Sequence, residues 1–130
     1  MFLSQSSSVR EDGVNTVYRV PVAEDDRIRA GLALQLVAAA TGVSAERMRG
    51  DRLAPPACRA RWLALYLSHV AFGWPLERVG HAFALNRATV GAACRWAEDA
   101  RDRPAMDALL DRLEEVARAV LDAPRWEPGI

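Results

Sequence analysis

The chain contains no lysine, and this absence excludes one large class of function. All 17 basic residues among its 130 are arginine. A phosphate-binding loop of the Walker type needs a lysine that reaches the β- and γ-phosphates of a nucleotide. The sequence therefore excludes a P-loop ATPase within this chain.

Cysteine, histidine and long apolar runs are also scarce. Cys58 and Cys94 are 36 residues apart and His69 and His81 are 12 apart, so neither pair has the spacing of a zinc site. The cysteines lie in apolar helical patterns, which predicts reduced, buried thiols in a cytosol. No stretch approaches the ~18 apolar residues of a membrane span, and the first residues lack the features of a signal peptide. We therefore expect a cytoplasmic protein with no metal, cofactor or membrane partner.

The net charge is zero, but the charges are unevenly distributed along the chain. Residues 44–101 carry nine arginines and five acidic residues, a net charge of +4. Residues 1–43 have a net charge of −1 and residues 102–130 a net charge of −3. A basic centre flanked by acidic ends keeps a nucleic-acid partner open despite the neutral total.

The length and composition predict a single domain. With 51% hydrophobic residues, the chain can bury a modest core without disulfides. We expect this domain to span residues 24–122, followed by a loose tail over residues 123–130. Residues 1–23 are expected to form a flexible arm, in which residues 14–22 alternate weakly and favour a short strand or an extended segment.

Helical periodicity dominates from Glu24 onwards and predicts a compact all-α domain of five to six helices. The expected helices cover residues 24–41, a short segment after Ser44, and residues 56–72, 75–83, 87–101 and 104–122. Gly and Pro at their ends supply the stop and start signals. The apolar rows expected to be buried are Ile28, Leu32, Leu36 and Ala39 or Ala40; Cys58, Trp62, Leu65, His69 or Val70, and Phe72; Leu76, Val79, Ala82 and Phe83; Val90, Cys94 and Ala97; and Met106, Leu109, Leu110, Leu113 and Val120.

Two of these helices form a helix-turn-helix pattern. Residues 75–83 would brace residues 87–101, with Ala84 and Leu85 as the turn and Asn86 as the N-cap. Such a pair allows the second helix to enter the major groove of DNA. The base-facing positions at its N-terminal end are Asn86, Arg87, Ala88 and Gly91, and Arg87 can donate two hydrogen bonds to guanine. Thr89 and Arg95 are better placed for phosphates.

The order of several separated motifs resembles a known family. They are Trp-Leu-Ala-Leu-Tyr-Leu from Trp62, Leu-Glu-Arg-Val-Gly-His-Ala-Phe from Leu76, Asn-Arg-Ala-Thr-Val from Asn86 and Ala-Cys-Arg from Ala93. In this order they resemble the C-terminal DNA-binding domain, domain IV, of the bacterial replication initiator DnaA. The resemblance covers about residues 24–121. It implies a DnaA domain IV-like fold and double-stranded DNA as the partner.

The resemblance also implies site residues in a second segment. The family's basic loop places an arginine in the minor groove beside the major-groove site. Arg49 and Arg52 occupy the matching loop, and Arg61 matches the arginine of the following helix motif. The resemblance therefore implies DNA contacts from Arg49, Arg52, Arg61, Asn86, Arg87, Ala88, Thr89 and Arg95.

The reading motif departs from the family at several positions. Leu85 replaces its opening arginine, Asn86 its acidic residue, Ala88 its first threonine and Ala92 the histidine before Ala-Cys-Arg. These losses argue against recognition of the initiator's own box, but not against DNA binding in general.

The resemblance implies a transcription regulator rather than a replication initiator. No ATPase domain precedes the matching segment, and freestanding copies of this domain resemble regulators such as the gene transfer agent activating factors. In those factors a DnaA-like part works beside a sigma-factor-like part. We therefore expect an activator that acts on gene transfer agent genes with a sigma-factor-like protein or RNA polymerase.

The alternative is a protein-interaction adaptor that keeps the fold but has lost specific DNA reading. The neutral net charge and the replaced reading residues favour it, and Trp96 would add support if it were exposed rather than packed. An enzyme is not expected, because no nucleophile accompanies the acidic residues of the last helix, which we interpret as its solvated face. These residues are Asp107, Asp111, Glu114 and Glu115.

Overall fold

Six α-helices build the part of the chain that the computed structural model describes, residues 20–129. No strand occurs in these residues. The prediction of a compact all-α domain with five to six helices is therefore confirmed. Residues 1–19 of the proposed arm, including most of the proposed strand, lie outside the described residues, as does Ile130. The helices are α1 (Glu24–Thr41), α2 (Ala45–Met48), α3 (Pro55–Ala71), α4 (Leu76–Phe83), α5 (Arg87–Ala100) and α6 (Pro104–Asp122).

Local signals set the helix ends close to where the sequence predicts them. Gly42 ends α1 in the left-handed region, with φ +78°, and its N–H donates to the Ala38 carbonyl. Ser44 caps α2 by accepting a hydrogen bond from the Arg47 N–H. Pro104 begins α6, where its missing N–H costs nothing.

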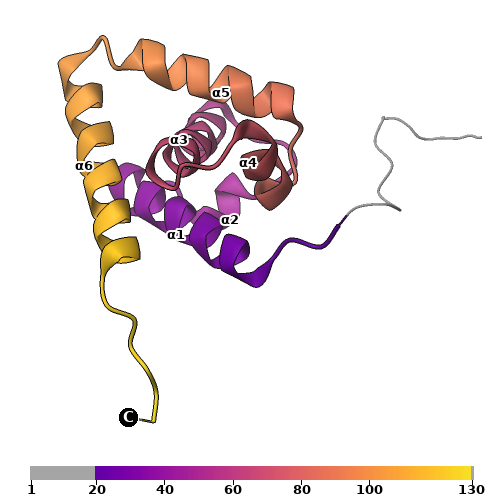
Figure 1. Cartoon of the computed structure of the whole chain (residues 1–130). Helices are drawn as coiled ribbons and strands as arrows, with labels where there is room; N and C mark the ends of the chain where they lie inside the picture. Colours follow the sequence, from indigo (N-terminus) through magenta and orange to yellow (C-terminus); the bar gives the residue numbers. More distant parts are fainter. Residues whose placement is uncertain (1–19, 130) are drawn as a thin grey trace, which may run out of the picture.

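Helix α3 lies at the centre of the fold and contacts all five other helices (Figure 1). Its middle is therefore buried on every side, from Leu63 through Ser68. The prediction of one buried stripe along α3 was therefore wrong. Of the predicted row, Leu65 is buried, whereas Cys58 and Trp62 are only half-buried. A stripe describes a helix with one solvent-facing side, and the middle of α3 has none.

The predicted buried row of α1 was also wrong. Ile28 is 62% exposed, and Leu32 and Leu36 are only half-buried. The helix instead buries Ala30, Ala33, Leu34 and Val37. Apolar residues surround most of α1, so helical periodicity alone does not select a face. Small alanine side chains let α1 approach α3 closely.

Helix α6 follows its predicted row only in part. Leu110 and Leu113 are buried, Met106 and Leu109 are half-buried, and Val120 is 52% exposed. The expectation of buried thiols was likewise wrong, since Cys58 and Cys94 are half-buried and free. Burial raises the pKa of the Cys94 thiol above its usual value.

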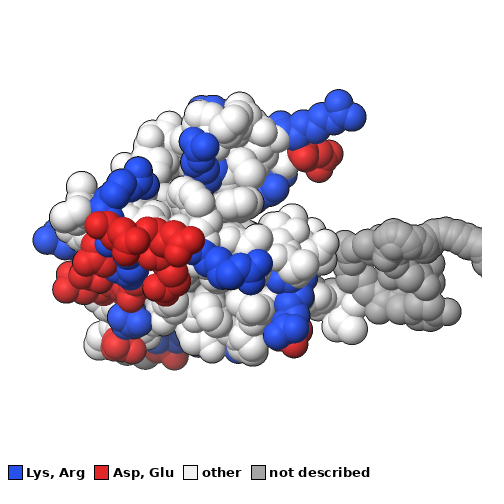
Figure 2. Space-filling view, turned by 90° about the horizontal axis from the view of Figure 1, so that it is seen from above, with Lys and Arg blue, Asp and Glu red and all other residues white. Residues whose placement is uncertain are grey.

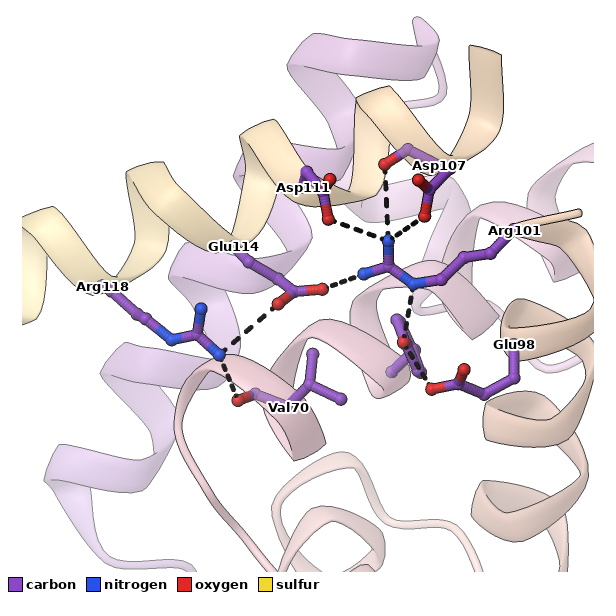
Figure 3. A network of polar contacts seen from close by, with 8 residues as sticks. Val70, Glu98, Arg101, Asp107, Asp111, Glu114 and Arg118 are labelled. Atoms are coloured by element: carbon purple, nitrogen blue, oxygen red, sulfur yellow. Dashed lines mark hydrogen bonds and ion pairs between the residues drawn. The ribbon is translucent and has the colours of Figure 1, made fainter. Parts of the chain in front are cut away.

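Arg101, just after α5, joins α5 to α6 through three carboxylates (Figure 3). Its Nη1 lies 2.6 Å from the Asp107 Oδ1 and 3.0 Å from the Asp111 Oδ1, and its Nη2 pairs with Glu114. The Arg101 side chain is only 18% exposed. The interpretation of these acids as a merely solvated face was therefore incomplete, because three of them hold the α5–α6 corner together.

The same arginine reaches the central helix through Tyr66. Arg101 Nε donates to the Tyr66 hydroxyl at 3.0 Å, and that hydroxyl donates to Glu98 at 2.6 Å. Burial of the phenol and its bond to Glu98 raise the pKa of Tyr66 to about 12. Arg118 adds a bond from α6 to the Val70 carbonyl near the end of α3. One polar network thus ties α3, α5 and α6 together.

The network predicts a large cost for replacing Arg101. Arg101→Ala leaves three neighbouring carboxylates without their shared cation, so we expect a loss of about 2–4 kcal/mol in the free energy of unfolding. Arg112→Ala is the control, because the Arg112–Glu115 pair on α6 is exposed and its atoms are 3.6 Å apart. It should cost below about 0.5 kcal/mol. Urea unfolding followed by circular dichroism measures both, and equal losses would contradict the prediction.

Candidate nucleic-acid interface

The turn between α4 and α5 packs against the backbone of α4 at Gly80. Ala84 ends α4 in the left-handed region, with φ +58°, and the Leu85 N–H donates to the Gly80 carbonyl at 2.9 Å. A Cβ on Gly80 would lie 2.5 Å from the Leu85 carbonyl oxygen. Only glycine allows this approach. The predicted helix-turn-helix is present, although α4 begins at Leu76 and Pro75 occupies its N-cap.

A small apolar cluster holds the two helices on the central helix. Val79 of α4, Val90 and Ala93 of α5, Leu65 of α3 and Trp74 are all buried together. The predicted inner rows of α4 and α5 therefore include the right residues at Val79 and Val90. This packing fixes the angle at which α5 presents its first turn to solvent.

Helix α4 is also held against α1 by an ion pair that sequence reasoning missed. Arg78 donates to both oxygens of Asp26, at 3.1 and 2.8 Å, and its guanidinium lies 4.7 Å from the centre of the Trp74 ring. The hydrogen bond from Arg78 lowers the pKa of Asp26. Asp26 was expected only to favour the α1 dipole, and a separation of 52 residues gives no local signal for such a pair.

Asn86 caps α5, and this role limits the base contact that the sequence predicts for it. Its Oδ1 accepts a hydrogen bond from the Thr89 N–H at 2.8 Å, as expected for an N-cap. Paired recognition of adenine by asparagine uses both the amide oxygen and the amide nitrogen. While the cap holds, one of the two lone pairs of the Asn86 Oδ1 is engaged and the orientation of the amide is fixed, which constrains a paired contact with a base.

The other predicted residues of α5 lie differently from one another. Arg87, Ala88 and Arg95 are exposed and Thr89 is half-buried. Gly91 is buried, so its expected place facing bases was wrong. A Cβ there would lie 3.9 Å from Leu76 of α4 and 3.4 Å from the Arg95 guanidinium. Arg87 Nε lies 3.6 Å from Glu77 Oε2, and both side chains are well exposed, so this pair is weak.

The predicted basic loop follows α2, and its arginines have distinct roles. Arg49 and Arg52 are exposed. Arg61 of α3 is half-buried, and its Nη1 donates to the carbonyls of Met48 and Gly50, at 3.4 and 3.3 Å. Arg61 therefore positions the loop, a role the sequence did not predict. Arg49 and Arg61 share a cavity with the end of α4, which brings the loop and the helix-turn-helix to adjoining surfaces.

The charges are unevenly distributed over the surface. Figure 2 shows acidic side chains gathered on the side toward the end of α5 and α6, with basic side chains around this cluster and over the rest of that view. The carboxylates around Arg101 belong to this acidic side. The neutral net charge is thus a sum of an acidic region and a more basic remainder.

Trp96 is half-buried and packs on Trp62 of α3, with ring centroids 5.8 Å apart at an interplanar angle of 70°. The expectation of an exposed tryptophan was therefore wrong, because Trp96 packs against the core. The adaptor hypothesis loses this support.

Comparison with known proteins gives matches among solved structures. A crystal structure of a DNA replication initiation factor matches with a TM-score of 0.65 and 25% identity over 73% of this chain. Replication initiator DnaA bound to AMPPCP and single-stranded DNA matches with a TM-score of 0.63 and 24% identity over 72%. The chain has a DnaA domain IV-like fold. No protein-family model and no curated protein matches it.

The DnaA-like fold confirms the fold that the sequence resemblance implied. The chain spans only about 30% of the length of the matched replication proteins. The comparison therefore concerns one region of those proteins.

Each helix between residues 20 and 129 is too short or too polar to cross a membrane.

The close approach at Gly80 predicts a specific sensitivity to an added methyl group. Gly80→Ala must push the Leu85 carbonyl away, so we expect a loss of about 1–3 kcal/mol in the free energy of unfolding. Gly31→Ala on α1 is the control, since no atom lies within 4 Å of its added Cβ. It should stabilise the helix by about 0.5–1 kcal/mol. Thermal unfolding compares them, and the same sign for both would contradict this account of the turn.

Proposed function

We propose that this protein binds duplex DNA through α5 and the loop of residues 49–54. The observation that carries the proposal is that Arg87 is exposed in the first turn of α5. Helix α4 packs against α5, and the close approach of Leu85 to Gly80 fixes the turn between them. The fold shared with replication proteins supports it, and one of those was solved with single-stranded DNA. In such an arrangement the N-terminal end of the second helix enters the major groove.

The exposed side chains divide into two kinds of contact. Arg87 can donate two parallel hydrogen bonds to the O6 and N7 of guanine, and Ala88 offers a methyl group for contact with thymine. Thr89 and Arg95, farther along α5, would bind phosphates, as would Arg49 and Arg52 of the loop. Arg61 would act mainly by holding the loop in place.

Replacing Arg87 tests this arrangement. On a duplex selected with the wild-type protein from random sequences, Arg87→Ala should weaken binding by about 1–3 kcal/mol and relax the preference at one base pair. Arg112→Ala removes a similarly exposed arginine whose ion pair has the same 3.6 Å distance, but on α6. It should bind as the wild type does. Gel shifts at low salt measure both, and absent duplex binding, or equal effects, would refute the proposal.

We further propose that DNA binding serves transcription regulation in the bacterial nucleoid. The resemblance to freestanding DnaA-like regulators supports this role, with gene transfer agent genes as targets and a sigma-factor-like protein or RNA polymerase as partner. The acidic side is formed by the end of α5 and by α6, whereas the proposed DNA contacts come from the loop and the first turn of α5. A polymerase-associated protein could therefore contact it while DNA is bound.

Mapping of bound sites in cells tests the regulatory role. The wild-type protein should occupy promoter regions, and transcripts from those promoters should fall when the gene is deleted. Arg87→Ala should lose the occupancy at equal protein level. Binding confined to a replication origin, or unchanged transcripts, would contradict regulation while leaving DNA binding intact.

One observation favours the adaptor as a second candidate. Ile28 of α1 and Val116 and Val120 of α6 are exposed apolar side chains outside the helix-turn-helix. Exposed apolar residues that gather on a surface are typical of partner contacts. A protein complex recovered equally with wild type and Arg87→Ala, together with no duplex binding, would support the adaptor.

A further inference from the structure

Three arginines from three separate elements surround one cavity of about 370 Å³. Arg27 comes from the first turns of α1, Arg49 follows α2, and Arg61 belongs to α3. The end of α4, through Phe83 and Ala84, closes another side. The other lining residues are Ala30, Gly31, Leu34, Met48 and Ala82, so no carboxylate lines the cavity within the described residues.

The arginines of this cavity are not paired with acidic side chains among residues 20–129. None of the three arginines forms an ion pair with a described residue. Arg61 is half-buried, and its Nη1 donates to two backbone carbonyls. Its buried Nε has no hydrogen-bond partner within the described residues. Arg101, which is also half-buried, is surrounded by three carboxylates instead. A partly buried cation without such partners favours an anion.

The place of the cavity identifies the anion. It lies between the start of the basic loop at Arg49 and the turn at Ala84 that leads into α5. One sugar-phosphate strand always separates a major groove from the neighbouring minor groove. With α5 in the first groove and the loop in the second, that strand must cross the surface between them, where the cavity opens.

We propose that this cavity seats a phosphate group of the DNA backbone and that Arg27 is a DNA-contacting residue. This inference rests on the proposed DNA binding and deepens it. Arg61 holds the loop and supplies charge from beneath, while the exposed Arg27 and Arg49 approach the phosphate from two sides. Arg27 lies in α1, outside every segment that the sequence motifs assign to DNA contact.

The two arginines of the first turns of α1 provide a matched experiment. Arg27 and Arg29 are two positions apart, about 200° around the helix. Arg29 lines a different cavity, with Asp25, Ile28 and Val120. Arg27→Gln and Arg29→Gln therefore remove the same charge from the same helix, one at the proposed phosphate seat and one away from it. Duplex affinity is measured for both variants and the wild type over a series of salt concentrations.

Loss of one phosphate contact lowers the slope of log affinity against log salt by about 0.9. We expect this reduction, and several-fold weaker binding at low salt, for Arg27→Gln, with Arg29→Gln close to the wild type. Equal slopes for wild type and Arg27→Gln, or equal reductions in both variants, would overturn the phosphate seat while DNA binding stands. Absent binding by the wild type would overturn both proposals.

A second measurement separates DNA phosphate from a free anion. Inorganic phosphate is added to wild type and Arg27→Gln without DNA, and thermal unfolding is followed. Under the proposal the two proteins respond alike, since the strand is held by the whole interface. Selective stabilisation of the wild type, combined with unchanged salt slopes, would assign the cavity to a soluble anion and overturn the proposal.

Discussion

The burial of α3 on every side is the constraint on which the rest of the structure depends. Each of the other five helices contacts it. Because its surface is divided among so many neighbours, those neighbours need only short contacts with one another. The α4–α5 pair can therefore stand on a small cluster around Trp74 and Val79, with its outer surface left open. The apolar core thus supplies rigidity, and α5 needs no large core of its own.

Polar contacts then fix orientations that apolar packing leaves adjustable. Arg78 joins α4 to Asp26 of α1 on one side of α3, and Arg101 joins α5 to α6 on the other. Hydrophobic burial is not directional, whereas a guanidinium bound to two or three carboxylates allows few arrangements. The same contacts concentrate acidic residues at one end of the molecule. Asp107, Asp111 and Glu114, which bind Arg101 at the α5–α6 corner, belong to the acidic side.

Local sequence signals predicted the helix ends and the turn well, because these depend on neighbouring residues. Gly42, Ser44, Asn86 and Pro104 each act within a few positions of where they stand. The buried faces of α1 and α3 were not predictable in this way. Alanine-rich and uniformly apolar helices offer several faces of similar hydropathy, and tertiary packing chooses among them.

The candidate site likewise has parts that local sequence predicts and parts that depend on tertiary packing. The first turn of α5 and the basic loop follow from motifs, but the contribution of Arg27 and the structural role of Arg61 depend on contacts between distant segments. Asn86 is an intermediate case, since the local sequence identifies it as a cap, and the cap bond engages one lone pair of its oxygen and fixes the amide.

The arrangement around Arg101 bears on the composition of the chain as a whole. Its guanidinium directs separate N–H groups to Tyr66, Asp107, Asp111 and Glu114, which lie in different directions around a plane. A lysine ammonium is a compact charge with three donors and cannot reach four such partners at once. At this corner arginine is a geometric requirement of the fold, whatever the origin of a sequence in which every basic residue is arginine.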